Sequence, residues 1–247
     1  MWCFFDESYP DEGGVTTVVA VLLHARSLPH IDQVIYRAKR KYFGREHAKD
    51  LSLELKGQKL LSNYSFKMAQ QYGSSKNHLV VQEVISELWK NVDEHPVYVF
   101  GAAVYGAKDI LRQPGKLSFP LVEILRRVSA AAGESGASVL VNLVFDEQLA
   151  DLQVAISLRR FVSGVQLRNV SHYPLIGVSH VTPGIQLADI GAYILGRRAV
   201  GDLRFKAWLS QLRQLEWTGT INGYSRMGIQ RWDAHPSGSV TVRKKWE

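Results

Sequence analysis

The sequence predicts an α/β fold in one domain, with a β-sheet that opens on an antiparallel hairpin and carries helices on its faces. Apolar segments of strand length alternate with segments of helical periodicity along most of the chain, which is typical of this class. The Gly13-Gly14 pair marks a tight turn between the first two predicted strands. No linker rich in proline or serine and no internal repeat divides the 247 residues, so one domain is favoured.

The predicted strands are short apolar runs, several of them rich in β-branched residues. In chain order they cover residues 2–5, 15–24, 51–55, 97–105, 138–145 and 173–180. In the third run, Leu51, Leu53 and Leu55 alternate with polar residues, so Glu54 and Lys56 are expected on one face of a strand or an extended edge.

The predicted helices carry apolar residues three and four positions apart. They cover residues 31–43, 59–91 with a break at 73–75, 119–132, 148–163, 183–198 and 205–215. Gly44 and Gly133 close two of them, and Pro183 opens the helix after the last strand. Residues 217–247 are rich in turn formers, which predicts a C-terminal appendage packed on a domain formed by residues 1–216.

The charge and the apolar content of the sequence indicate which kinds of partner the protein can bind. The chain has 30 Lys and Arg against 23 Asp and Glu, a formal charge of +7, which favours a nucleic-acid partner, although a merely basic surface is an equally good interpretation. No apolar run reaches the roughly 18 residues of a membrane span, and no signal peptide is recognisable, so no membrane partner and a cytoplasmic location are expected. The sequence leaves the oligomeric state open.

Several kinds of site are excluded by their missing residues. The one cysteine, Cys3, rules out an internal disulfide and a thiolate metal cage. Neither a Gly-x-x-x-x-Gly-Lys-Ser loop nor a Gly-x-Gly-x-x-Gly turn occurs, so a nucleotide cofactor has no recognisable binding motif. The eight histidines include no His-Glu-x-x-His pair, and His172 and His180 are interpreted as strand-edge residues.

Acidic residues follow two predicted strands in the same way. Phe5-Asp6-Glu7 and Phe145-Asp146-Glu147 each lead from an apolar run into acid, and ligand sites form at strand ends in α/β sheets. Asp189 lies in an otherwise apolar helical segment, so it is expected to face inward. With Glu54, four carboxylates can converge, although any one of them alone is more simply interpreted as a loop or helix cap.

Clustered carboxylates predict a Mg²⁺ or Mn²⁺ site, because hard oxygen ligands suit these ions and the cation compensates the buried charge. Two such ions can activate water and stabilise the leaving oxygen in phosphodiester hydrolysis. We expect Asp6 and Asp146 to bridge or flank the metal and Glu54 and Asp189 to complete its shell. Lys56 is expected to steady a phosphate or the attacking water.

The same residues resemble a known family. Phe-Asp-Glu-Ser at residues 5–8, Glu54-Leu55-Lys56, Phe145-Asp146-Glu147 and Gln-Leu-Ala-Asp at residues 186–189 are similar, in this order, to the prokaryotic family catalogued as domain of unknown function 3800. The resemblance covers about residues 2–198 and implies an RNase H-like mixed sheet with metal-dependent nuclease activity. It implies an acidic core of Asp6, Glu54, Asp146 and Asp189, with Glu7 and Glu147 as further candidate metal ligands. One departure is Tyr9-Pro10, where the family usually has glycine.

Two other functions fit parts of the pattern. Glu54-Leu55-Lys56 matches the Glu-x-Lys half of a restriction-type nuclease site, which would leave Asp6 and Asp189 without a role. An RNase H-like sheet can also serve as a non-catalytic docking module for nucleic acid or protein, since fold does not dictate function.

Overall fold

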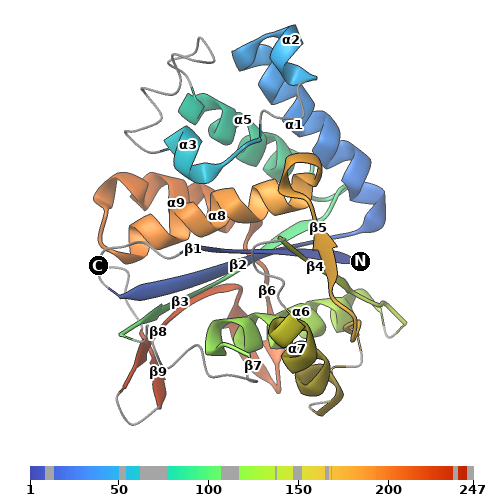
Figure 1. Ribbon diagram of the computed structural model, residues 1–247, viewed down its shortest axis with the longest axis vertical. Coiled ribbons are helices and arrows are strands. Elements are labelled where there is room, and N and C mark those ends of the chain that lie inside the picture. Colours follow the sequence, from blue (N-terminus) through green and yellow to red (C-terminus); the bar gives the residue numbers. More distant parts are fainter. Residues whose placement is uncertain are drawn as a thin grey trace.

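A mixed β-sheet lies at the centre of the molecule (Figure 1). The computed structural model describes residues 1–8, 14–49, 54–61, 77–106, 117–136, 138–146, 152–164, 167, 169–235 and 239–243. Within these residues, seven strands form the sheet in the order β5-β4-β1-β2-β3-β8-β9. They are β1 (Trp2–Ser8), β2 (Val15–Leu23), β3 (Val97–Tyr105), β4 (Asn142–Asp146), β5 (Leu175–Gly177), β8 (Ile229–Ala234) and β9 (Val240–Val242).

Strand directions confirm the predicted α/β class and the N-terminal hairpin. β1 and β2 pair antiparallel, with Trp2 opposite Leu23 and Ser8 opposite Thr17. β2 also pairs antiparallel with β3, whereas β1 with β4, β4 with β5, and β3 with β8 are parallel pairs. β9 is antiparallel to β8. The parallel strands β1 and β4 therefore run toward the same end of the sheet, where each carries an aspartate, Asp6 and Asp146.

Helices cover both faces of the sheet (Figure 1). On one face lie α1 (Leu28–Phe43), α2 (Arg45–Ala48), α3 (Gly57–Leu61), α5 (Asn77–Lys90), α8 (Pro183–Ala199) and α9 (Lys206–Leu212). On the other lie α6 (Phe119–Ser135) and α7 (Leu152–Gly164). All nine residues of β2 are buried, because both of its faces are covered. Short 3₁₀ turns complete the described structure: η1 (Ala25–Ser27), η2 (Ser179–Val181), η3 (Leu203–Phe205) and η4 (Arg213–Leu215).

Side chains of β1 alternate between two cores, one on each face of the sheet. Phe4 packs with α8 and α1, whereas Cys3 and Phe5 pack with α6. This alternation decides which acidic side chains can meet, because Asp6 belongs with Phe4 and Glu7 belongs with Phe5. None of the helices among the described residues is long and apolar enough to cross a bilayer.

The C-terminal segment takes part in the central sheet. β8 and β9 extend the sheet beyond β3, and Trp217 and Trp232 are buried in the core beneath α6. Among the described residues of this segment, β6 (Thr218–Ile221) and β7 (Tyr224–Met227) form a separate hairpin, with its turn at Asn222 and Gly223, which both have positive φ. The described part of residues 217–247 therefore joins the sheet and the core of the residues before it.

Two predicted strands differ from the structure. Residues 54–56 are not paired with the sheet, and the Lys56 N–H instead donates to the Glu54 carbonyl at 3.1 Å, while residues 51–53 lie outside the described part. The run at 173–180 gives only the three residues of β5, because the chain then turns into η2, where the Val181 N–H donates to the Val178 carbonyl at 3.1 Å. The predicted helix 59–91 is described as α3 and α5, and residues 62–76 between them lie outside the description.

Candidate metal centre

Strands β1 and β4 bring Asp6 and Asp146 to the same corner of the sheet. Phe5 lies opposite Phe145 in the parallel pair, so the next residue of each strand, an aspartate in both, follows at the same level. The two phenylalanine rings stack on the α6 face with centroids 4.7 Å apart, so Asp6 and Asp146 point to the α8 face. Both are buried, with exposed fractions of 9% and 6%.

Helix α8 approaches the sheet closely enough to add Asp189 to this corner. A Cβ on Gly184 would overlap the ring of Phe4, and one on Gly191 would lie 2.9 Å from Cγ1 of Val19. The missing side chains allow the helix to pack directly on β1 and β2. Asp189 then forms a side-chain hydrogen bond with Asp6. Such a bond requires a proton on one of the two carboxyl groups.

Residues 54–56 bring a second acid and a cation to the site. Glu54 is 6% exposed, and its Oε2 lies 3.3 Å from Nζ of Lys56. Nε2 of His180, from η2, lies 3.9 Å from the same oxygen, and its side chain is half exposed. Glu54 therefore sits between two groups that can carry positive charge.

Two side chains of α8, one turn apart, fasten this segment to the helix. Oε1 of Gln186 accepts the Leu55 N–H at 3.2 Å, and Oδ2 of Asp189 accepts the Gly57 N–H at 2.5 Å. Nε2 of Gln186 donates to the carbonyls of Ser179 and His180 at 2.9 and 3.1 Å. Gln186 therefore joins both the Glu54 segment and η2 to the helix that carries Asp189.

Gly57 makes this contact possible. A Cβ at Gly57 would lie 2.7 Å from Cβ of Tyr193 and 3.0 Å from Cα of Ile190, so any larger residue would force the segment away from α8. The close approach sets the short hydrogen bond to Asp189 and thereby the position of Lys56 immediately before it.

The electrostatics of the site show an excess of negative charge. Burial and the neighbouring charge of Asp189 raise the pKa of Asp6 to about 8, although the Glu7 N–H donates to its Oδ1 at 2.7 Å. Burial also raises the pKa of Asp189, against the bond from Gly57 and the charge of Lys56. For Lys56, burial acts to lower the pKa, but the charges of Glu54 and Asp189 outweigh it and the pKa is raised. The acids together hold a proton that a divalent cation would replace.

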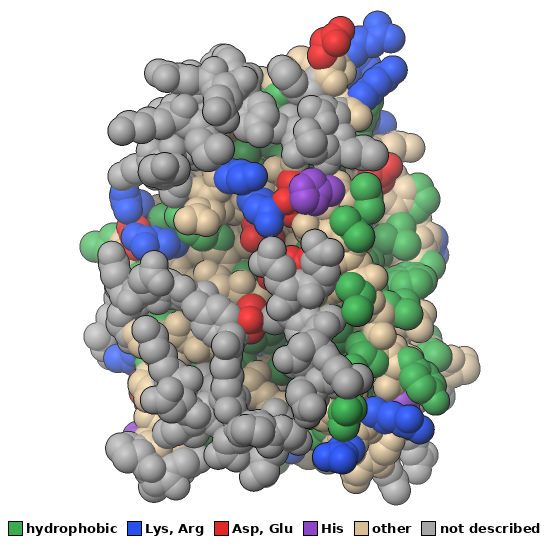
Figure 2. Space-filling model, viewed as in Figure 1, with side chains coloured by type: hydrophobic (Ala, Val, Ile, Leu, Met, Phe, Trp, Pro, Cys, Tyr) green, Lys and Arg blue, Asp and Glu red, His purple; other side chains and the backbone are tan. Residues whose placement is uncertain are grey.

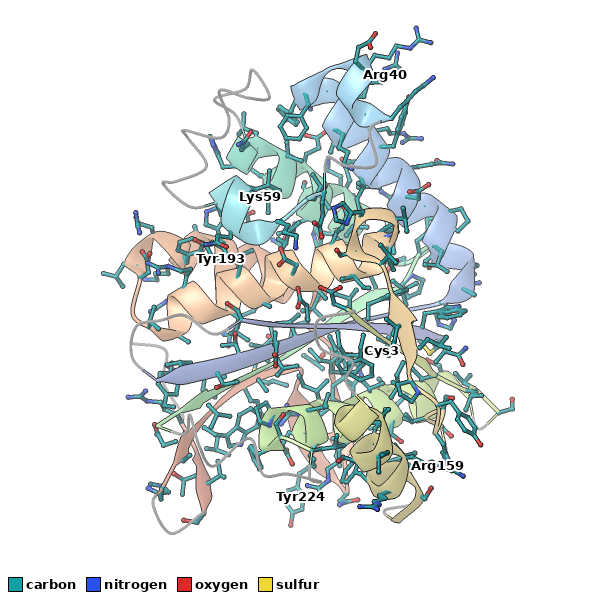
Figure 3. The ribbon with its side chains drawn as sticks, viewed as in Figure 1. Cys3, Arg40, Lys59, Arg159, Tyr193 and Tyr224 are labelled. Atoms are coloured by element: carbon teal, nitrogen blue, oxygen red, sulfur yellow. The ribbon has the colours of Figure 1, made fainter. Side chains whose placement is uncertain are left out.

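The site is accessible from one side of the molecule. Figure 2 shows acidic side chains in the middle of this face, beside a histidine and basic side chains. Lys59 on α3 and Tyr193 on α8 lie on the same side of the sheet (Figure 3). In the described part of the site, basic side chains therefore surround the acidic side chains at its centre.

Five of the predicted site residues come together on the α8 face. They are Asp6, Asp146, Asp189, Glu54 and Lys56. Glu7, on the neighbouring position of β1, belongs to the opposite face and does not join them. Glu147 lies outside the described residues.

The described acidic side chains do not form a complete set of metal ligands in their present conformations. Among the residues that the structure describes, no three His, Cys, Asp or Glu side chains form a group that could hold a metal ion as they stand. The reason is visible in their partners: Asp189 is bonded to Gly57 and Asp6, and Glu54 is paired with Lys56. Binding of a cation requires loss of the shared proton and rotation of at least one of these side chains.

Sequence reasoning did not identify the roles of Gln186, Gly57 and His180. A polar residue three positions before Asp189 in an apolar helix was a usable signal for Gln186, because a buried amide must find partners. The contact between His180 and Glu54 depends on the η2 turn, for which the sequence pattern of 173–180 gave no sign.

No protein-family model matches this chain, and the search of curated proteins found no similar sequence.

Proposed function

We propose that the chain is a metal-dependent nuclease of RNase H-like type, which hydrolyses phosphodiester bonds of DNA or RNA with Mg²⁺ or Mn²⁺. The observation that carries the proposal is the group of buried acids formed by Asp6, Asp146 and Asp189. The pKa of Asp6 is raised to about 8, and Asp6 shares a hydrogen bond with Asp189. The negative charge of the acids is therefore not fully compensated by neighbouring positive charge. A divalent cation with oxygen ligands supplies that charge.

Strand topology supports the RNase H-like part of the proposal. The five strands β5-β4-β1-β2-β3, in which only β2 runs against the others, have the order expected of such a domain. The helices α6 and α7 follow β3 and β4, and α8 follows β5. The acids lie on β1, β4 and α8, the elements that meet at the corner described above.

The residues present fit a divalent metal in their chemistry. Asp6, Asp146, Asp189 and Glu54 would hold it, since all four are oxygen donors from one buried group. A bound metal would activate water and stabilise the leaving oxygen of a phosphodiester. Lys56, which is 30% exposed and already paired with Glu54, is placed to attract a phosphate to the acids.

Nucleic acid is the substrate class that the charge of the chain favours. The formal charge is +7, and basic residues stand at the rim of the acidic site (Figure 2). Polyanions approach such a surface readily, and the local acids would oppose them unless a metal neutralises the acids. We therefore expect both the binding and the cleavage of nucleic acid to depend on the metal.

Cleavage of labelled single- and double-stranded DNA and RNA tests the proposal, with Mg²⁺, Mn²⁺ or a chelator. We expect metal-dependent cleavage that falls at least about 100-fold in Asp6→Asn and in Asp146→Asn. Glu7→Gln is the matched control, because Glu7 neighbours Asp6 but belongs to the other face, and it should keep its activity.

Other outcomes point to the alternatives. Cleavage that survives both Asp6→Asn and Asp146→Asn but is lost in Lys56→Ala would favour a restriction-type site built on Glu54 and Lys56. Binding of nucleic acid without cleavage in any metal would favour a non-catalytic docking module.

A further inference from the structure

The edge strand β5 and the turn after it expose an unusual number of apolar side chains. Of the large hydrophobic side chains that are exposed in the described structure, a cluster belongs to this short stretch, with exposed fractions between 43% and 66%. They are Tyr173, Leu175, Ile176, Val178 and Val181. Figure 2 shows hydrophobic side chains along the side of the molecule where Figure 1 shows β5. We call residues 171–181 the β5 strip.

In the described part of the structure, the backbone of β5 has a strand partner on one side and none on the other. Among the residues that the structure describes, β5 stands first in the sheet order and pairs only with β4, through Leu175 opposite Val144 and Gly177 opposite Asp146. An edge strand presents unpaired N–H and C=O groups, and natural proteins protect such edges with charged side chains, bulges or a covering segment. The β5 strip has Pro174 before its strand and no Asp, Glu, Lys or Arg, and its ionisable side chains include His172 and His180.

The charge distribution indicates what can bind here. From Asn169 to Ala188 the sequence contains no Asp, Glu, Lys or Arg, although the chain as a whole carries a formal charge of +7. A nucleic acid would find no lysine or arginine in the β5 strip itself. Two copies of the chain, in contrast, can meet at this uncharged surface without the repulsion that contact between their basic surfaces would cause.

We propose that β5 is the interface of a homodimer, in which the β5 strips of two copies pair antiparallel across a two-fold axis. Isologous pairing covers both open edges at once and buries the same apolar side chains from each copy. Arg159, 5.7 Å over the ring of Tyr173, would lie at the rim of this interface (Figure 3). The inference is independent of the nuclease proposal, because it uses no residue of the acidic group.

Molar mass measured by sedimentation or light scattering tests the dimer, from about 1 to about 100 µM protein. We expect twice the 27.8 kDa of the chain. Ile176→Lys and Val178→Lys place like charges opposite each other across the two-fold axis, and each should raise the dissociation constant at least about 100-fold. Both side chains are exposed, so the thermal unfolding curve of the monomer checks that the fold is kept.

Leu203→Lys is the matched control, because Leu203 is 69% exposed but lies in η3, away from β5. This variant should remain dimeric. A wild-type protein that stays monomeric over the whole range overturns the proposal. So does a dimer that both lysine variants of the β5 strip leave intact, since its interface must lie elsewhere.

Discussion

Asp6 combines burial, a carboxyl neighbour and a raised pKa, and these three properties make the stability of the protein depend on pH. In an unfolded chain an aspartate has a pKa of about 3.9, whereas the pKa of Asp6 in the folded protein is about 8. Between these values the folded state binds one proton more than the unfolded state. The free energy of unfolding therefore falls as the pH rises from about 4 to about 8.

Asp6→Asn removes this proton and should flatten the dependence on pH. In the presence of a chelator, we expect the wild-type protein to lose on the order of 2 kcal/mol more than Asp6→Asn between pH 5 and pH 8. Urea unfolding of both proteins at the two pH values measures the difference. Mg²⁺ at pH 8 should restore the loss in the wild type and not in the variant. Parallel pH profiles of the two proteins would show that Asp6 does not hold the proton.

Gln186 contributes through three hydrogen bonds of its buried side chain, which is 3% exposed. Gln186→Leu leaves the Leu55 N–H and two carbonyls without their partner, so we expect a loss of about 2 to 3 kcal/mol in the free energy of unfolding. Gln33→Leu serves as the control, because Gln33 is exposed and its Oε1 accepts a hydrogen bond from the exposed side chain of Arg37, so its effect should stay within about 0.5 kcal/mol. Chemical denaturation distinguishes the two. An equally small effect of Gln186→Leu would mean that other groups hold residues 54–57 against α8.

At the scale of elements, α8 decides whether the acids meet. It packs against β1 and β2 through glycines, and Gly184 lies against the ring of Phe4. Gly184→Ala should push the helix away from the sheet and cost about 1 to 3 kcal/mol. Gly164→Ala, at the end of α7 with no atom within 4 Å of the added Cβ, should be neutral or stabilising by up to about 1 kcal/mol. Thermal unfolding of both variants is the measurement, and equal stability would contradict the packing described for α8.

The elements that sequence analysis predicted well are those whose pattern is set by burial. β3 was predicted at 97–105 and is found there, because its apolar run is covered on both sides. α8 was predicted at 183–198 and runs from Pro183 to Ala199, since Pro183 fixes its start. The alternating leucines of residues 51–55 predicted a strand or an extended edge, but residues 54 and 55 do not pair with the sheet, and Leu55 is buried in the core on the α8 face. Periodicity reports that a side chain is buried, and it does not identify the element that buries it.

The whole molecule explains why part of the candidate site could be predicted and part could not. Asp6 and Asp146 follow similar apolar runs, so their positions at two strand ends were visible in the sequence. That β1 and β4 are adjacent and parallel is a property of the complete sheet, as is the assignment of Glu7 to the opposite face. The role of β8 and β9 was missed for the same reason: β8 pairs with residues of β3 more than a hundred positions earlier, and β9 joins the sheet only through β8.

The central claim is that these acids bind a divalent cation, and calorimetric titration with Mn²⁺ near neutral pH tests it most directly. Because Asp6 has a pKa of about 8, we expect binding to release a proton, so the measured heat should change with the ionisation enthalpy of the buffer. Asp6→Asn and Asp146→Asn should weaken binding at least about tenfold, and Glu7→Gln should leave it unchanged. No binding by the wild type, or equal affinity in all four proteins, would contradict the claim.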